Sequence, residues 1–360
     1  MEHLKAHTGL RGVAAMTVAP IHMYCEVFVP GFDTIVLPWL HGALAVDIFF
    51  ILSGFILPYV YLSGGHSSMK SSWKAFFIAR FARIYPLHLA TIAAAGVMIL
   101  VGKAMKLPMG RPYEISDILP QLLLIHTFPG IEVWGWIHPS WSLSMEALAY
   151  VAIFPVIGIW IRQRSRLLIK LAAIALLTIL YLATYAQCDQ PTENAAMGWF
   201  AMGRVSSCFT MGMILWSILR DHDRMTKALQ SGSGILLTVF IGGYAGSCLG
   251  GYPFPWLILV VPWLVLALTS NVPSVSNRIL GNRVVVWLGT ISYSIYMIHT
   301  LFGKIIAGLA SKVDPSPVSG IFMLIGVFAL LLAISTLSYH WFENPARRWI
   351  QHKFSPTPHP

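Results

Sequence analysis

Four side chains that can take part in acid–base chemistry lie inside apolar stretches of this sequence: His22, Asp47, Glu146 and His299. Burying such a group in hydrocarbon costs several kcal/mol by most estimates, so each marks a candidate functional site. At about 1.5 Å per helical residue, all four are expected in one layer, in the outer half of a membrane. Two imidazoles and two carboxylates in one layer can pair a general base with an orienting carboxylate, which is how a proton is removed from a hydroxyl.

For some ionisable residues in the apolar stretches, a purely structural role is an alternative to a functional one. Asp47, Arg204 and Lys304 fit buried helix-packing groups as well as they fit a site, and Lys304 lies late enough in its stretch to extend to the membrane surface. His126 and His138 are expected at the outer interface, where histidine is ordinary.

Two arginines, Arg80 and Arg83, precede the third apolar stretch in the segment FIARFARIYP. A spacing of three residues places both guanidinium groups on one helical face. Planar guanidinium groups match phosphate oxygens, so the pair could hold a phosphorylated donor from the cytoplasm. The alternative is a pair of positive anchors for lipid head groups, and the spacing alone favours that alternative.

The composition predicts that these residues are held by helices in a membrane. Of 360 residues, 56% are hydrophobic and 11% are charged, whereas a soluble domain carries about 25% charged residues. A spanning helix needs roughly 20 mainly apolar residues, so the chain has room for about ten. The apolar stretches lie near residues 12–29, 39–62, 84–101, 138–161, 167–187, 199–219, 232–250, 254–270, 285–310 and 318–342.

The expected fold is all-α, a polytopic membrane helix bundle of about ten transmembrane helices. One transmembrane domain is expected over residues 1–345, followed by a short cytoplasmic tail, 346–360, whose proline-rich end is disordered. The apolar segment from Ile118 to Phe128 is too short to cross a bilayer, so we expect it to be re-entrant or interfacial and packed beside the fourth stretch.

Lysines and arginines in the connections predict the orientation, because they are retained in the cytoplasm during insertion. With the amino terminus inside, most of the 24 lysines and arginines fall on cytoplasmic segments. An even number of spans with both termini cytoplasmic fits this distribution. We expect a multi-pass protein of the inner, cytoplasmic membrane.

The net charge of +10 does not indicate nucleic-acid binding, because the basic residues are scattered between apolar stretches. Cys25, Cys188, Cys208 and Cys248 lack a CxxC spacing, so neither a metal site nor a disulfide framework is expected. A bridge between Cys188 and Cys248 on the outer side stays open.

Six stretches in order resemble the membrane acyltransferase 3 family over nearly the whole chain. The first runs from Arg11 to His22, and the third contains Arg80 and Arg83. The other four are DIFFILSGF (47–55), PSWSLSMEALAY (139–150), SYSIYMIH (292–299) and FENPAR (342–347). Each stretch alone is a weak signal, whereas their shared order, with each on the membrane side that the charges predict, is a strong one.

The resemblance implies transfer of an acyl group, usually acetyl, from cytoplasmic acyl-CoA to a hydroxyl of a carbohydrate or glycoside. Under it His22 is the catalytic histidine and Glu146 is its partner. Tyr296 and His299 line the acceptor side. The remaining assignments are the coenzyme A phosphates for Arg11, Arg80 and Arg83, and substrate contacts for Asp47 and Ser142.

Two mechanisms fit this assignment: His22 takes the proton of the acceptor hydroxyl, or His22 is itself transiently acylated. A proton-coupled transporter or a flippase for lipid-linked sugars is the alternative function, because such proteins also bury histidines and carboxylates. A non-catalytic scaffold of a polysaccharide-synthesis complex is a third. The expected partners are the bilayer, the acceptor, and either a second copy or a polysaccharide-synthesis machinery.

Overall fold

A computed structural model describes residues 4–23, 25, 28, 42–63, 73–106, 113–187, 196–250, 254–269, 274–309 and 317–354. The described residues form helices and connections, with no strand among them. In chain order the helices are α1 (Lys5–Val18), α3 (Gly42–Tyr61), α4 (Trp73–Ala104), α5 (Ile118–Leu122), α6 (Ser140–Leu148), α7 (Phe154–Arg162), α8 (Leu167–Ala186), α9 (Gly198–Asp221), α10 (Asp223–Ser231), α11 (Ser233–Gly250), α12 (Val261–Ala267), α13 (Val275–Leu280), α14 (Arg283–Thr290), α15 (Ser292–Leu309), α16 (Pro317–Ser338) and α17 (Asn344–Phe354).

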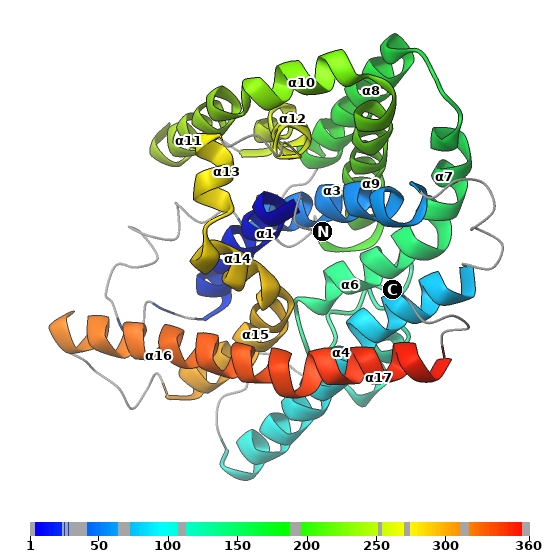
Figure 1. Ribbon diagram of the computed structural model, residues 1–360. Helices are drawn as coiled ribbons and strands as arrows, with labels where there is room; N and C mark the ends of the chain where they lie inside the picture. Colours follow the sequence, from blue (N-terminus) through cyan, green and yellow to red (C-terminus); the bar gives the residue numbers. More distant parts are fainter. Residues whose placement is uncertain are drawn as a thin grey trace.

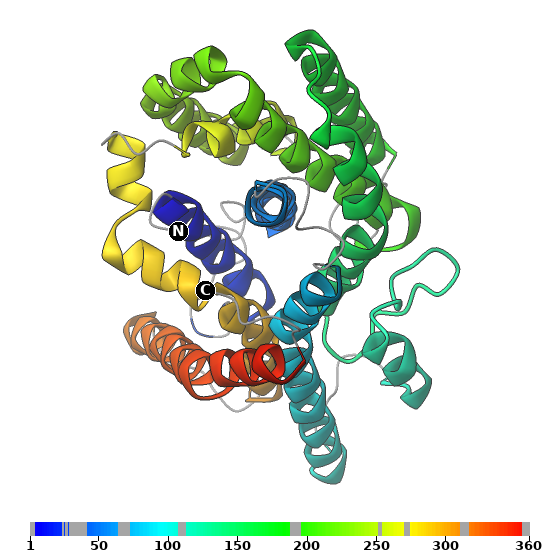
Figure 2. The same cartoon turned by 45° about the vertical axis from the view of Figure 1, so that its right-hand side comes forward.

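Helices α1 and α3 lie at the centre of the molecule (Figure 1). In Figure 2 α3 is viewed nearly end-on, and the other helices surround it and α1. Helix α3 packs against α9 and α1, while α1 also packs against α13, α14 and α15. Arg11 on α1 and Asp47 on α3 therefore lie on helices that are surrounded by others.

Glycines allow α3 and α9 to approach each other backbone to backbone. A Cβ atom added at Gly54 would lie 2.0 Å from the carbonyl oxygen of Phe209, and one added at Gly212 would lie 2.1 Å from that of Ile51. Membrane helices commonly associate through such small residues, because van der Waals contact rather than exclusion of water drives their packing.

Seven helical segments among the described residues are long and apolar enough to span a membrane, and α14 with α15 adds an eighth if this pair, bent by 67°, is one span. Two of the seven are continuous through π-helical turns that join α6 to α7 and α16 to α17. The prediction of an all-helical, multi-pass protein is confirmed. The count of ten is not, and the placement of the termini stays a prediction.

Two expected spans differ from the helices observed. Residues 12–29 were expected to form one span, but α1 ends at Val18 and a 3₁₀ turn, Ala19–His22, follows it. Pro20 explains this ending, because its ring blocks a helix from continuing through it and it has no backbone N–H. Residues 254–267 form a 3₁₀ stretch and the short helix α12, with Pro262 near its start.

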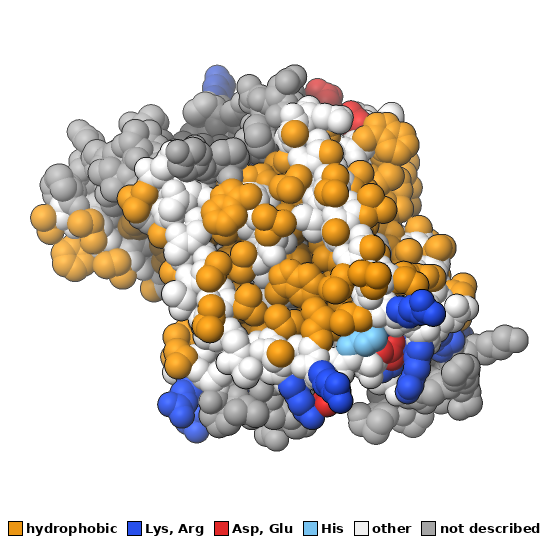
Figure 3. All heavy atoms as spheres, turned by 90° about the horizontal axis from the view of Figure 1, so that it is seen from above, with side chains coloured by type: hydrophobic (Ala, Val, Ile, Leu, Met, Phe, Trp, Pro, Cys, Tyr) orange, Lys and Arg blue, Asp and Glu red, His pale blue; other side chains and the backbone are white. Residues whose placement is uncertain are grey.

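The apolar side chains on the outer surface support placement of the protein in a bilayer. Figure 3 shows a broad hydrophobic band, with lysine and arginine side chains gathered mainly along one edge of it. Large apolar side chains face outward on α8 and α16, among them Leu168 at 76% exposure and Phe322 at 69%. In water such a surface would aggregate, whereas in lipid it is the ordinary outer face of a spanning helix.

The short apolar segment at 118–128 packs against α6, as the sequence predicts. Helix α5 covers only Ile118–Leu122. The buried Gln121 donates from Nε2 to the Ser140 hydroxyl at 2.6 Å, and the Ser144 hydroxyl donates to the Leu124 carbonyl at 2.7 Å. These bonds fix the start of α6, which carries two of the predicted site residues.

Candidate functional site

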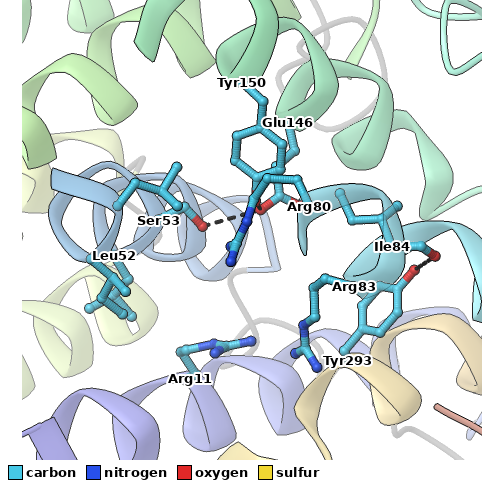
Figure 4. Close-up of a pocket in the computed structure, with 11 residues that line it drawn as sticks. Arg11, Leu52, Ser53, Arg80, Arg83, Ile84, Glu146, Tyr150 and Tyr293 are labelled. Carbon is cyan, nitrogen blue, oxygen red and sulfur yellow. Dashed lines mark hydrogen bonds between the residues drawn. The ribbon is translucent and has the colours of Figure 1, made fainter. Parts of the chain in front are cut away.

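Three arginines line one cavity of about 100 Å³, hereafter the arginine cavity. Arg11 comes from α1, whereas Arg80 and Arg83 come from α4. In Figure 4 the three guanidinium groups point into a common space below Glu146 and Tyr150. Helix α4 begins at Trp73, so both arginines lie within a helix, as the shared helical face expected from their spacing requires.

The arginines differ in how far their charges are already paired. Arg83 donates to Glu343 in an ion pair. Arg80 donates to the Tyr61 hydroxyl at 3.4 Å and lies 5.8 Å from the centre of the Tyr150 ring. Arg11 has no hydrogen bond or ion pair with any residue that the structure describes. Arg11 is therefore the most available of the three for an anionic or strongly polarised ligand group.

A second cavity of about 70 Å³, hereafter the inner cavity, adjoins the first. Both cavities are lined by Arg11, Ser53, Glu146 and Tyr293, which lie where the two meet. The remaining lining of the inner cavity comes from α3, α6 and α15 and includes Phe49, Ser142 and Tyr296. Polar groups thus lead from the arginines toward the residues of the PSWSLSMEALAY and SYSIYMIH stretches.

Two histidines meet beyond the inner cavity. The His299 Nε2 atom lies 3.4 Å from Nδ1 of His22, and the His299 ring centre lies 5.9 Å from that of Tyr296, which lines the inner cavity. His299 is fully buried, whereas His22 is partly accessible. A third imidazole, His138, has its ring centre 5.0 Å from that of His22 and stacks on Trp134 at 4.6 Å.

The carbonyls beside these histidines determine which nitrogens carry protons. His299 Nδ1 lies 3.1 Å from the Ile295 carbonyl oxygen, and because a carbonyl only accepts, a neutral His299 keeps its proton on Nδ1. Its Nε2 is then an acceptor toward His22 Nδ1, which also faces the Val18 carbonyl at 3.3 Å. A neutral His22 is therefore protonated on Nδ1, and its Nε2 has the lone pair that a general base needs.

Glu146 does not occupy the place predicted for it. Its carboxylate accepts hydrogen bonds from the Ser53 hydroxyl, at 3.3 Å, and from the Tyr150 hydroxyl, and it lines both cavities. No hydrogen bond between Glu146 and His22 occurs among the described residues, and the imidazole with a nitrogen within hydrogen-bond distance of His22 is that of His299.

Asp47 also lies apart from the two histidines. Its carboxylate pairs with Arg204 at 2.9 Å and accepts hydrogen bonds from Tyr181 and Tyr185, at 2.6 and 3.2 Å. Asp47 and Arg204 have 0% and 1% of their side chains exposed, and neither lines either cavity. The helix-packing alternative therefore describes this pair. Lys304 lies over the ring of Tyr113, 4.1 Å from its centre.

Sequence reasoning did not single out several residues that the structure brings to the site. Ser53, Tyr150 and Glu343 belong to stretches that carry the family resemblance, so a reading of whole motifs would have included them. His138 was expected only at the interface, and nothing local in the sequence indicates its contact with His22. Cys188 lies outside the described residues, so the bridge to Cys248 stays a prediction.

Known proteins match this sequence over nearly its whole length. The profile of an acyltransferase domain matches residues 5–340. The chain is 28% identical to the acyltransferase MdmB of Streptomyces mycarofaciens, over 96% of this chain and 92% of that protein. It is 25% identical to the putative peptidoglycan O-acetyltransferase YrhL of Bacillus subtilis and 23% identical to the peptidoglycan O-acetyltransferase OatA of Listeria monocytogenes. These matches cover 94% of this chain but only 54% and 55% of those proteins, so the chain spans about half their length. No solved structure matches it.

Proposed function

This chain belongs to the membrane acyltransferase 3 family, and we propose that it moves an acyl group, in the first instance acetyl, from cytoplasmic acyl-CoA to a hydroxyl of a carbohydrate or glycoside. The observation that carries the proposal is a spatial arrangement of three features, one after another: a cavity with three arginines, a narrow polar inner cavity, and a pair of histidines in contact.

The arginine cavity suits the charged part of the donor. Coenzyme A carries phosphates on a bulky nucleotide, joined to a thin arm that ends in the thioester. Guanidinium groups bind phosphate oxygens through paired N–H donors. Arg80 and Arg83 hold the phosphates in this proposal, and the arm extends past Glu146 into the inner cavity. Arg11 lies where the cavities meet, so in this proposal it holds either the phosphate next to the thin arm or the thioester carbonyl.

His22 is the catalytic base in the proposal. Its Nε2 takes the proton of the acceptor hydroxyl while the hydroxyl oxygen attacks the thioester carbonyl carbon. The carbon–sulfur bond then breaks, and the departing thiolate takes the proton from the imidazolium, which leaves the ester and free coenzyme A. His299 is the positioning residue, because its Nε2 accepts a hydrogen bond from the Nδ1–H group of His22 and so holds the orientation of the His22 ring.

The acceptor and the placement in the cell belong to the proposal as well. Relatives named as peptidoglycan O-acetyltransferases support a carbohydrate acceptor. The lysine and arginine side chains along one edge of the hydrophobic band in Figure 3 support a cytoplasmic face on that side, and cytoplasmic termini in an inner membrane are part of the proposal. Glu146 holds the wall of the donor passage through Ser53 and Tyr150.

Replacement of His22 tests the proposal. Purified protein in liposomes is given acetyl-CoA and a mixture of cell-surface saccharides, and products are identified by the mass of an added acetyl group. We expect His22→Ala to lose at least a hundredfold in rate, the lower range for losing a general base. His340→Ala, which alters an exposed histidine, is the matched control. Acetylation by His22→Ala at the wild-type rate would refute the role of His22, and transport of the saccharide without a gain in mass would favour a transporter.

A further inference from the structure

We infer that Phe49, Ser142 and Tyr296 form a gate that limits the length of the acyl chain that can reach His22. The inference rests on the proposed function, and it assigns to these residues a selectivity that acyl transfer by itself does not require. The three side chains come from α3, α6 and α15, so the gate lies where three separate helices meet.

Tyr296 stands between the inner cavity and the histidines. Its side chain lines the inner cavity, and on its other side its ring lies 5.9 Å from that of His299, which contacts His22. Only 6% of Tyr296 is exposed. In the proposal, an acyl group on its way from the inner cavity to His22 passes Tyr296.

Three contacts hold the Tyr296 side chain in place. Its hydroxyl is 2.8 Å from the Ser142 hydroxyl oxygen and donates to the Pro139 carbonyl at 3.3 Å. The Phe49 ring packs against the Tyr296 ring edge to face, with centres 5.9 Å apart and planes at 70°. The hydrogen bonds hold the end of the side chain and the Phe49 ring supports its face.

The small size of the inner cavity makes this barrier sensitive to chain length. Ligand pockets commonly measure roughly 300–1,000 Å³, whereas the inner cavity holds about 70 Å³. Extra methylenes forced into a packed apolar wall push side chains out of their preferred rotamers. One methylene in a hydrophobic pocket changes selectivity by about 10- to 200-fold. The wild-type protein should therefore prefer acetyl to butyryl by at least about tenfold.

A competition experiment tests the gate without depending on how much protein is active. Equimolar acetyl-CoA and butyryl-CoA are offered together, and the ratio of butyryl to acetyl ester in the product is measured by mass spectrometry. Phe49→Ala removes the supporting ring, and we expect it to raise that ratio about tenfold. Phe240→Ala is the matched control, because Phe240 lies on α11 beside a different cavity, and its ratio should stay at the wild-type value.

A second variant decides the result if Phe49→Ala gives too little product. Tyr296→Phe keeps the ring and removes the bond to Ser142, so the ratio should move in the same direction. Tyr85→Phe is its control, since the Tyr85 hydroxyl bonds the Leu122 carbonyl away from both cavities. A ratio that stays at the wild-type value in Phe49→Ala and Tyr296→Phe, or a wild type that transfers both chains equally, overturns the gate. A wild type that acylates nothing with either donor overturns the proposed function instead.

Discussion

At the scale of the residue, the contact between His22 and His299 differs most from the expectation. A carboxylate was expected to orient His22, because Glu146 is the acidic residue that the motif supplies. The structure puts a second imidazole there, and the Ile295 carbonyl fixes its tautomer. A neutral orienting group does not add a charge to stabilise an imidazolium, so its effect is on the position and tautomer of His22.

Replacing His299 tests this positioning role. We expect His299→Ala to lower kcat about 10- to 100-fold, less than the 10²- to 10⁴-fold of losing a general base itself. The KM for acyl-CoA should not change, because His299 lines neither cavity. His299→Gln should recover part of the rate, since an amide oxygen can accept the hydrogen bond from Nδ1 of His22.

Two results would contradict the role of His299. The first is a wild-type kcat in His299→Ala. The second is a kcat in His299→Gln that is as low as that of His299→Ala. His138→Ala is the comparison, because the His138 ring also packs near His22. Its loss of rate should be smaller than that of His299→Ala.

At the scale of the element, α15 holds the end of α1 at the distance that the two histidines need. The 3₁₀ turn that carries His22 packs against α15. A Cβ atom added at Gly303 would lie 2.0 Å from the His22 carbonyl oxygen, so only a glycine at position 303 permits this approach. The site depends on this contact between two elements that lie far apart in the sequence.

Gly303→Ala is therefore expected to lower the rate of acyl transfer. The added methyl group collides with backbone rather than with a flexible side chain, so the turn must move away from α15. Small displacements of reacting groups can reduce rates by about a hundredfold. The matched control is Gly326→Ala on α16, where nothing lies within 4 Å of an added Cβ atom. Wild-type activity in Gly303→Ala, measured on folded protein in the same liposome assay, would show that this spacing is not critical.

The elements also show how far the sequence could predict the structure. Apolar stretches with few charges identify most spans, because bilayer thickness fixes the length of a helix that crosses it. The 3₁₀ turn after α1 was also open to prediction, since Pro20 is visible in the sequence. The pairing of His22 with His299 was not, because residues 277 positions apart meet only through the tertiary packing of α1 against α15.

At the scale of the whole molecule, a buried polar cluster joins the helices beside the site. The Asp47 carboxylate on α3 binds Arg204 on α9 and two tyrosines of α8. Arg204 also donates to the Ala43 carbonyl at 3.1 Å. Each charge was visible in the sequence as an unusual intramembrane residue, but the partners are more than 130 positions apart and a single sequence gives no sign of their pairing.

Breaking the pair of Asp47 and Arg204 should destabilise the protein without altering the chemistry. Asp47→Asn leaves the Arg204 charge buried without its partner, a change that costs about 3–5 kcal/mol. The unfolding temperature in detergent should fall accordingly, while the rate per folded molecule stays near the wild-type value because neither residue lines the arginine cavity or the inner cavity. Asp223→Asn, which breaks the exposed pair with Lys227, should leave the unfolding temperature unchanged. If Asp47→Asn unfolds at the wild-type temperature, or remains stable but loses its rate, Asp47 has a role other than joining these helices.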